Sequence, residues 1–256
     1  DELVQALFDM YTQALRAKDK PVFGSAHPLR ITVQGGIGTH EEDAFLLDYY
    51  GVDGTGWGTP FLLVPEATTV DEQTLQLLRN AKEKDVVLSH NSPLGVRFHY
   101  LKGTTSEKEK FARIDKGAPG SPCTEKFLVS NTEFGPEPLC TASRTYQKKK
   151  IDQLNASNLP EDELSRQMQD VLDKECLCIG LSNSAALKYN QIFINNLSAV
   201  TICPGPNIIN FSKVVSLQTM VDHIYGRKNL HGNINRHHMF ITELRLYIDY
   251  LKEQLS

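Results

Sequence analysis

The sequence predicts a mixed α/β fold, because strand-like and helix-like segments alternate in its first third and helical patterns dominate the rest. Hydrophobic residues make up 40% of the 256 residues and charged residues 23%, which is the composition of an ordinary globular protein. Glycine-containing turns separate the predicted strands from capped helices, as in sheets whose parallel strands are connected by helices. We therefore expect a βαβα unit followed by a helix-rich α/β region.

The first helix and strand follow from local signals. Apolar residues at helical spacing predict a helix over residues 3–18, and β-branched residues predict a strand over 28–33. Thr39 and Glu42 form a capping box, a pair whose side chains can satisfy free N–H groups in the first turn of a helix. The next helix is therefore expected to begin at about His40.

A second strand and helix repeat this pattern. The short strand that starts at Gly51 leads into the glycine-rich turn 54–59. Thr69 and Glu72 form another capping box, which predicts a third helix. Strands that are joined through a helix pair in parallel, so these elements predict a small parallel sheet.

The pattern changes after about residue 85, and a soft boundary between residues 85 and 105 is expected to separate a unit of residues 1–85 from residues 86–256. The expected helices of the second part cover 106–117, 141–154, a segment that starts at Pro160, and 238–255. Residues 86–88 form a brief apolar run, and residues 89–103 are expected to be a loop. Short strands are expected over 176–179 and 200–203. The last helix is expected to have one apolar face, formed by Ile241, Leu244, Ile248, Leu251 and Leu255.

Two glycine turns follow the two strands of the βαβα unit. Gly35, Gly36 and Gly38 lie in the first turn, and Gly56 and Gly58 lie in the second. Backbone N–H groups at such turns can approach an anion closely because glycine has no Cβ, and the dipole of the following helix adds to the attraction. The carboxyl ends of neighbouring parallel strands lie together, so the two turns could supply N–H groups to one phosphate.

A simpler interpretation is that both turns only need the positive φ angles that glycine permits. The acidic residues Glu41, Glu42 and Asp43 follow the first turn directly, and there they compete electrostatically with a bound phosphate. Short glycine motifs are weak signals, so their spacing alone leaves both interpretations open.

Several short motifs in a defined order add to the glycine pattern. They are Gln34–Gly38, Gly51–Gly54, Gly58–Leu62 and Glu66–Ala67, with an amphipathic helix between the first two. Together they resemble the end of the barrel of nitronate monooxygenases (2-nitropropane dioxygenases), and the related flavin-dependent enoyl reductases share them. The resemblance covers about residues 1–80 and implies that this unit is the last part of a (β/α)8 barrel.

The resemblance also implies a cofactor and its contacts. In that family, one turn after strand seven and another after strand eight hold the phosphate of FMN. By position, Gly35, Gly36, Gly58 and Thr59 would be the phosphate contacts of this chain. The implied function is that of part of an FMN-dependent oxidoreductase that acts on a small-molecule substrate.

Three departures from the family pattern bear on this assignment. Trp57 stands where the family usually has a small residue or Met, and Pro60 stands where it has Arg. The family's catalytic His, in a Gly-Gly-His turn one strand earlier, has no counterpart, since His27 lacks that context. Only two barrel strands are recognisable, so the catalytic residues are expected before Asp1. The open sheet is expected to need a missing N-terminal barrel half, or a second copy of the chain, to cover it.

The five cysteines are Cys123, Cys140, Cys176, Cys178 and Cys203, each near Pro, Gly, Ser or Thr. Cysteines in such turns can ligate an iron–sulfur cluster, and a flavin beside a cluster would form an electron-transfer pair. No Cys-x-x-Cys motif is present, so buried and inert thiols are the favoured interpretation. The low cysteine density indicates a reducing, cytoplasmic compartment rather than a disulfide framework.

Two further turns, Gly180–Ala185 and Cys203–Asn207, are rich in hydroxyl, amide and proline groups. Helix capping is their favoured role, because every helix start needs partners for its free N–H groups. A ligand pocket at strand ends is the alternative.

Charge and hydropathy exclude two classes of partner. Lys and Arg number 27 against 31 Asp and Glu, and this net charge of −4 offers no electrostatic support for nucleic-acid binding. No apolar run approaches the roughly 18 residues of a membrane-spanning helix. Besides the flavin oxidoreductase, two functions stay open: a non-catalytic interaction module with structural glycine turns, and an electron-transfer module with a cysteine-ligated cluster.

Overall fold

The structure is a computed structural model and describes residues 2–123, 125–194, 197–232 and 236–255. The helices are α1 (Glu2–Ala17), α2 (His40–Asp48), α3 (Glu72–Asn80), α4 (Thr105–Asp115), α5 (Arg144–Asn155), α6 (Glu161–Asp173), α7 (Leu177–Lys188), α8 (Leu217–Ile224) and α9 (Met239–Leu255). The strands are β1 (Thr32–Gln34), β2 (Gly54–Gly56), β3 (Val86–Ser89) and β4 (Phe98–Leu101). The 3-10 turns are η1 (Thr59–Leu63), η2 (Glu83–Asp85) and η3 (Pro206–Asn210).

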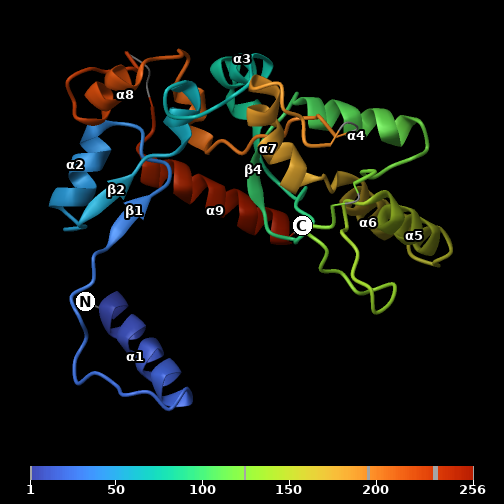
Figure 1. Cartoon of the computed structure of the whole chain (residues 1–256), viewed down its shortest axis with the longest axis horizontal. Helices are drawn as coiled ribbons and strands as arrows, with labels where there is room; N and C mark the ends of the chain where they lie inside the picture. The colour runs from blue at the N-terminus through green and yellow to red at the C-terminus, as the bar shows by residue number, and fades with distance from the viewer. Residues whose placement is uncertain (1, 124, 195–196, 233–235, 256) are drawn as a thin grey trace.

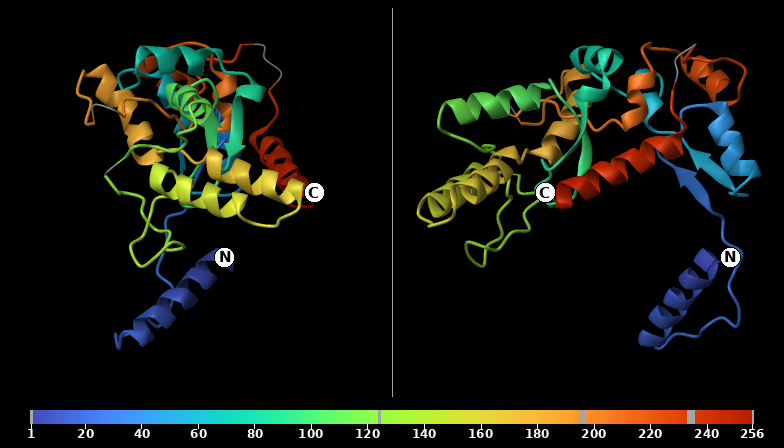
Figure 2. Two further views of the ribbon diagram at one scale, coloured as in Figure 1. Left: turned by 90° about the vertical axis from the view of Figure 1, so that its right-hand side faces the viewer. Right: turned by 180° about the vertical axis from the view of Figure 1, so that it is seen from behind.

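The described elements form a mixed α/β fold, as the sequence predicts, with two small sheets of two strands each. One end of the body holds α2, β1 and β2, and the other end holds the packed pair α5 and α6 (Figure 1). Helix α9 runs along the body between these two ends, which the view from behind also shows (Figure 2). Helix α1 projects away from the body in every view.

The βαβ part of the predicted βαβα unit is confirmed. Strands β1 and β2 pair in parallel, with Thr32 opposite Gly54 and Gln34 opposite Gly56. Helix α2 connects them, and its N-cap is the expected Thr39, whose hydroxyl accepts a hydrogen bond from the Glu42 N–H. The two strands form a sheet of their own in the described residues, so a larger part of a barrel is not seen.

The cap of the third helix lies elsewhere than the sequence suggests. Asp71, not Thr69, caps α3, and its carboxylate accepts a hydrogen bond from the Thr74 N–H at 3.0 Å. Aspartate is as good an N-cap as threonine, so adjacent candidates cannot be separated by propensity alone.

The segment 89–103, expected to be a loop, contains strand β4. Strand β4 pairs antiparallel with β3, with Val86 opposite Leu101 and Ser89 opposite Phe98. Pro93 and Gly95 mark only the connection of this hairpin. The prediction was wrong because those two turn residues obscured a strand of four residues.

The two strands expected in the last third are absent from the described residues. Residues 176–179 form the start of α7, and a short apolar run cannot distinguish a strand from a buried helix by its periodicity. Residues 200–203 belong to no sheet, and their backbone groups bond to three different places. The Val200 and Ile202 carbonyls accept from Ser106 and Leu101, and the Thr201 N–H donates to the Gly180 carbonyl.

The turn expected over residues 180–185 is part of the same helix, so a capping role for its serines was wrong. Ser182 donates back to the Ile179 carbonyl at 2.9 Å. Ser184 instead joins α7 to the start of α3, since its hydroxyl accepts from the Asp71 N–H and donates to the Asp71 carboxylate.

The main hydrophobic core draws on both sides of residue 85. Its buried members are Leu63, Val64, Val70, Leu75, Leu78, Leu101, Ile202, Ile208, Phe211 and Met220. A smaller cluster of Ile37, Leu46 and Met239 lies beneath the first glycine turn. Segments far apart in the sequence therefore hold the βαβ unit in place.

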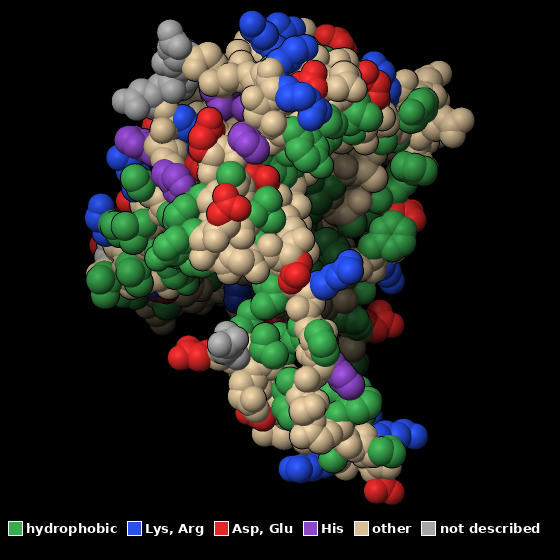
Figure 3. Space-filling view, turned by 90° about the vertical axis from the view of Figure 1, so that its left-hand side faces the viewer, with side chains coloured by type: hydrophobic (Ala, Val, Ile, Leu, Met, Phe, Trp, Pro, Cys, Tyr) green, Lys and Arg blue, Asp and Glu red, His purple; other side chains and the backbone are tan. Residues whose placement is uncertain are grey.

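Apolar side chains also remain exposed on two helices. Helix α1 has no buried residue. The apolar face predicted for α9 is exposed: Leu244 and Leu251 are each 57% accessible. Figure 3 views the side on which α2, β1 and β2 lie and shows further apolar side chains spread over this face and over the projecting segment.

Among the described residues, no helix combines the length and the apolar character that crossing a membrane requires.

Candidate functional site

The four residues expected to contact a phosphate lie around one hollow. Gly35, Gly36, Gly58 and Thr59 line a cavity of about 290 Å³ at the carboxyl ends of β1 and β2. Parallel pairing of the two strands brings the turns together, since each turn leaves its strand at the same edge of the sheet. The other lining residues are Gln34, Ile37, Gly56 and Asn207.

The glycines of the first turn are required by backbone conformation. Gly35 has a φ of 103° and Gly36 a φ of 72°, values that strain any other residue. Gly58 differs, because its φ of −113° is ordinary and a Cβ built there would meet nothing within 4 Å. Contacts within the described chain therefore do not explain a glycine at position 58.

Hydrogen-bond donors of both turns remain free at the hollow. The N–H groups of Gly36, Gly58 and Thr59 donate to no acceptor within residues 2–123, 125–194, 197–232 and 236–255. The Thr59 hydroxyl accepts from the Gly205 N–H at 2.9 Å, which leaves its own hydrogen available to another acceptor. The hollow is therefore lined by residues of two neighbouring turns whose donors have no acceptor in the described chain.

Asn207 completes the hollow, and it was not among the expected site residues. Its side-chain NH₂ donates to the Ile37 carbonyl at 3.0 Å and ties η3 to the first glycine turn. The side chain is 4% exposed, and its Oδ1 has no partner among the described residues. The sequence signal that could have identified Asn207 was the Cys203–Asn207 turn, for which the sequence analysis gave a ligand pocket as the alternative to helix capping.

The acidic residues after the first turn do not enter the hollow. The Glu42 carboxylate accepts from the Gly38 N–H at 2.8 Å, from the Met239 N–H and from the Arg236 guanidinium. The Asp43 carboxylate accepts from Thr55 and from the Trp57 indole. Both carboxylates are thus occupied inside the protein, and no carboxylate lines the hollow in the described residues.

Glu41 points to solvent instead. Backbone hydrogen bonding at the start of α2 holds the pKa of its carboxyl below the usual value. This carboxylate is therefore charged at neutral pH, on the outer side of the helix. The three acidic residues therefore act on the hollow only through their charge at a distance, and none of them lines it.

Arg236 lies against the first glycine turn. One guanidinium nitrogen donates to Glu42, and another donates to the Gly36 carbonyl at 2.8 Å. A Cβ at Gly38 would lie 2.7 Å from the guanidinium, so a glycine is needed there. Arg236 thereby places a positive charge beside the turn.

Two buried histidines support the same turn from below. His223 Nε2 donates to the Gly38 carbonyl at 2.9 Å, while its Nδ1 accepts from the Leu230 N–H. His231 Nε2 lies 2.6 Å from the same carbonyl. Burial is the main cause that lowers the pKa of His223, and the neighbouring His231 lowers it further.

This burial predicts a stability loss below neutral pH. The unfolded chain binds a proton at His223 near its ordinary pKa of 6.5, whereas the folded protein resists that proton. Stability from this group is therefore complete above pH 6.5 and decreases as the pH falls further. We expect the free energy of unfolding to fall by about 1 kcal/mol more in the wild type than in His223→Gln between pH 7.5 and 5.5.

Urea unfolding of both proteins at the two pH values measures this difference. Burial also lowers the pKa of His99. Because His99 is present in both proteins, its effect on stability cancels in the comparison. An equal loss of stability in the wild type and in His223→Gln would show that His223 is not the group responsible.

Comparison with known proteins adds no relative to this description. No protein-family model matches the chain, and no curated protein matches it.

Proposed function

We propose that the hollow between the two glycine turns binds the phosphate of FMN, in an oxidoreductase that resembles nitronate monooxygenases and flavin enoyl reductases. The observation that carries this proposal is the convergence of Gly35, Gly36, Gly58 and Thr59 on one cavity at the ends of two parallel strands. The order of the sequence motifs predicts this convergence, and both fit the same ligand.

The chemistry of the lining suits a phosphate. The N–H groups of Gly36, Gly58 and Thr59 and the Thr59 hydroxyl are donors, and a phosphate monoester offers three acceptor oxygens. Of the two buried carboxylates that follow the first turn, Glu42 pairs with Arg236, and Asp43 accepts hydrogen bonds from Thr55 and Trp57. Neither carboxylate lines the hollow. A dianion at this place therefore meets donors rather than like charge.

Gly58 supports the same proposal. The chain itself leaves space for a side chain at this position and imposes no unusual φ. A ligand that fills the hollow would need that space, which explains a glycine that the protein's own packing does not. The unpartnered Oδ1 of the buried Asn207 would similarly find a donor in a hydroxyl of the ribityl chain.

FMN would supply the redox chemistry, and this chain would bind and orient its phosphate end. The residues that contact the isoalloxazine ring and transfer protons would lie on further barrel strands, which an N-terminal barrel half or a partner chain would supply. The protein would act in the cytoplasm. The exposed apolar side chains of α1 and α9 and the short open sheet suit such a covering partner.

Titration with FMN and riboflavin, followed by flavin fluorescence, tests the phosphate contact. Riboflavin lacks the phosphate, so we expect the protein to bind FMN at least about tenfold more tightly. Gly58→Ala is expected to weaken FMN binding by about tenfold or more without changing stability, since its Cβ fills only the hollow.

Gly24→Ala is the matched control. Gly24 also has an ordinary φ and open space around its Cβ, and it lies outside the hollow. It should leave FMN binding unchanged. Equal binding of FMN by Gly58→Ala and the wild type, or no FMN binding by the chain with its covering partner, would contradict the proposal.

A non-catalytic interaction module is the second candidate, and the exposed apolar faces of α1 and α9 favour it. It requires no ligand in the hollow. The same titration separates the two, because this candidate predicts neither FMN binding nor any effect of Gly58→Ala.

A further inference from the structure

Four of the five cysteines converge on a second cavity, remote in sequence from the glycine turns. The cavity has a volume of about 90 Å³ and is lined by Cys123, Cys140, Cys176 and Cys178. Cys203 does not line it and is exposed. Among the residues that the structure describes, no group of three or more His, Cys, Asp or Glu side chains could hold a metal ion. The chemistry that these four side chains share is that of the thiol.

The backbone at the start of α7 brings the thiols of Cys176 and Cys178 together. Within a regular helix, side chains two positions apart do not face each other, so two such thiols would not meet. Cys176 is the N-cap of α7 and lies outside the helix, with a φ of −76° and a ψ of 76°. A hydrogen bond of 2.9 Å from the Leu177 N–H to the Glu175 carbonyl closes a γ-turn around it. This turn allows the hydrogen bond between the two thiols.

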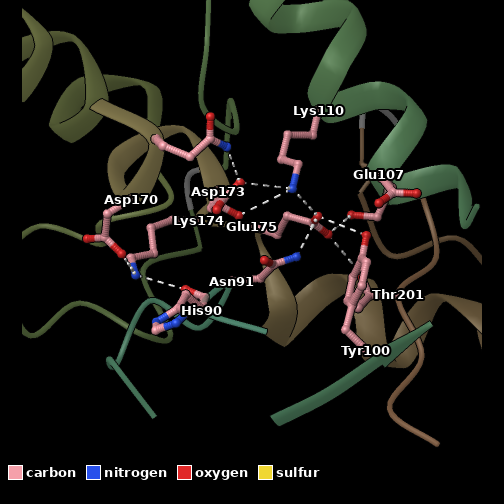
Figure 4. A network of polar contacts seen from close by, with 12 residues as sticks. His90, Asn91, Tyr100, Glu107, Lys110, Asp170, Asp173, Lys174, Glu175 and Thr201 are labelled. Atoms are coloured by element: carbon pink, nitrogen blue, oxygen red, sulfur yellow. Dashed lines mark hydrogen bonds and ion pairs between the residues drawn. The ribbon is translucent and has the colours of Figure 1, made fainter. Parts of the chain in front are cut away.

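A buried polar network holds that turn in place. The Glu175 carboxylate receives hydrogen bonds from Asn91 and Tyr100 and an ion pair from Lys110 (Figure 4). The Glu175 side chain is almost completely buried, and the Glu175 N–H donates to the Asn91 carbonyl at 3.0 Å. Side chain and backbone thus fix the residue before Cys176, and with it the position of the Cys176 thiol.

Cys178 is the thiol that ionises most readily among the five. The hydrogen bond from Cys176 lowers the pKa of Cys178, whereas burial raises the pKa of Cys123, Cys140 and Cys203. The thiolate is the form of cysteine that attacks disulfides. Cys178 is also partly exposed and borders the cavity, so a small molecule can reach its sulfur.

Cys176 is placed to react after Cys178. Contact with Cys178 is the main cause that raises the pKa of Cys176. A covalent bond at the Cys178 sulfur removes this cause, because the captured sulfur is uncharged and no longer competes for the proton. The Ser121 hydroxyl and the Cys123 thiol also contact Cys176, and both lower its pKa. These two donors would stabilise a Cys176 thiolate once Cys178 has reacted.

The space beside the two thiols suits a small disulfide. The rest of the lining is largely apolar, with Phe127, Leu128, Val129, Leu139 and Ala142 among its side chains. A volume of about 90 Å³ admits a substituent of only a few heavy atoms. Disulfide sulfurs with short substituents therefore match the cavity in size and polarity.

We propose that Cys178 and Cys176 form a dithiol that exchanges with small organic disulfides. The Cys178 thiolate would attack one sulfur of the disulfide, form a mixed disulfide and release one thiolate, which takes a proton from solvent. Cys176 would then lose its proton to solvent, attack the Cys178 sulfur and release the second thiolate, which is protonated in turn. The small disulfide gains two electrons and becomes two thiols, and the chain gains a disulfide between Cys176 and Cys178. This site is separate from the proposed flavin site, so each proposal can fail without the other.

Reaction of the reduced chain with bis(2-hydroxyethyl) disulfide under anaerobic conditions tests the site. After the remaining thiols are blocked with N-ethylmaleimide, trypsin cuts behind Lys174 and Lys188 and places Cys176 and Cys178 in one peptide. We expect this peptide to be unblocked and lighter by two hydrogen atoms, with about two small thiols released per chain. In Cys176→Ser we expect about one thiol released, and the hydroxyethylthio group should stay on Cys178.

Cys203→Ser is the matched control and is expected to give the wild-type product, because Cys203 lies outside the cavity. A wild-type peptide 175–188 that is fully blocked by N-ethylmaleimide would overturn the proposal. A crosslink of Cys123 to this peptide as the main product would overturn the assignment of the pair, as would the same trapped intermediate in Cys203→Ser. Repeating the reaction in urea should abolish the preference for Cys178, and an unchanged preference there would show that the fold is not its cause. The wild-type product decides the question even if a variant fails to fold.

Discussion

Lys110→Met is expected to lower the free energy of unfolding by about 3–5 kcal/mol, because it leaves a buried carboxylate without its counter-charge. Lys110 Nζ lies 3.0 Å from Glu175 Oε1, and both side chains are nearly inaccessible to solvent. Tyr100 and Ser106 also donate to this carboxylate, each at 2.9 Å. These neutral donors stabilise the negative charge but cannot balance it.

Urea unfolding at neutral pH measures the loss. Lys252→Met is the matched control, since Lys252 forms an exposed ion pair with Asp249, and we expect it to change stability by less than about 0.5 kcal/mol. Adding Glu175→Gln to Lys110→Met removes the stranded charge and is expected to restore at least about 1 kcal/mol. A loss below about 1 kcal/mol in Lys110→Met would mean that water or another cation reaches Glu175.

Leu63→Ala is expected to destabilise the protein by about 3 kcal/mol, because it opens a cavity in the main core. Leu63 is completely buried in the cluster that contains Leu78 and Met220, and its carbonyl accepts from the Val215 N–H at 3.1 Å. Since this cluster joins residues on both sides of position 85, the loss should affect the whole body.

Two probes check whether the body unfolds as one unit. Trp57 is the sole tryptophan and reports on the second glycine turn, whereas far-ultraviolet circular dichroism reports mainly on the later helices. We expect both signals to shift together in Leu63→Ala. The exposed Leu244→Ala should shift neither by more than about 0.5 kcal/mol. A shift confined to Trp57 would support separate units divided near residue 85.

Local sequence signals predicted those features that depend on neighbouring residues. Thr39 caps α2 as expected, because the bond that it accepts comes from Glu42, three residues away. Gly35 and Gly36 have the positive φ angles expected of a tight turn. Parallel pairing of β1 and β2 also followed, since a helix connects them.

Predictions failed where local signals were ambiguous. The short apolar run 176–179 fits a buried strand and a buried helix equally well, and only packing selects the helix. The apolar face of α9 was recognisable from its spacing, but spacing cannot say whether a neighbour covers it.

The motifs in the first third of the sequence located the glycine turns and the four residues at the hollow. This was possible because turns and caps are determined by residues close together in the sequence. Long-range contacts supplied the rest. Thr59 meets Gly205 across 146 positions, and Asn207 meets Ile37 across 170. The four cysteines likewise come from three segments with no recognisable spacing. Such contacts depend on how the whole core packs, so no local pattern of residues encodes them.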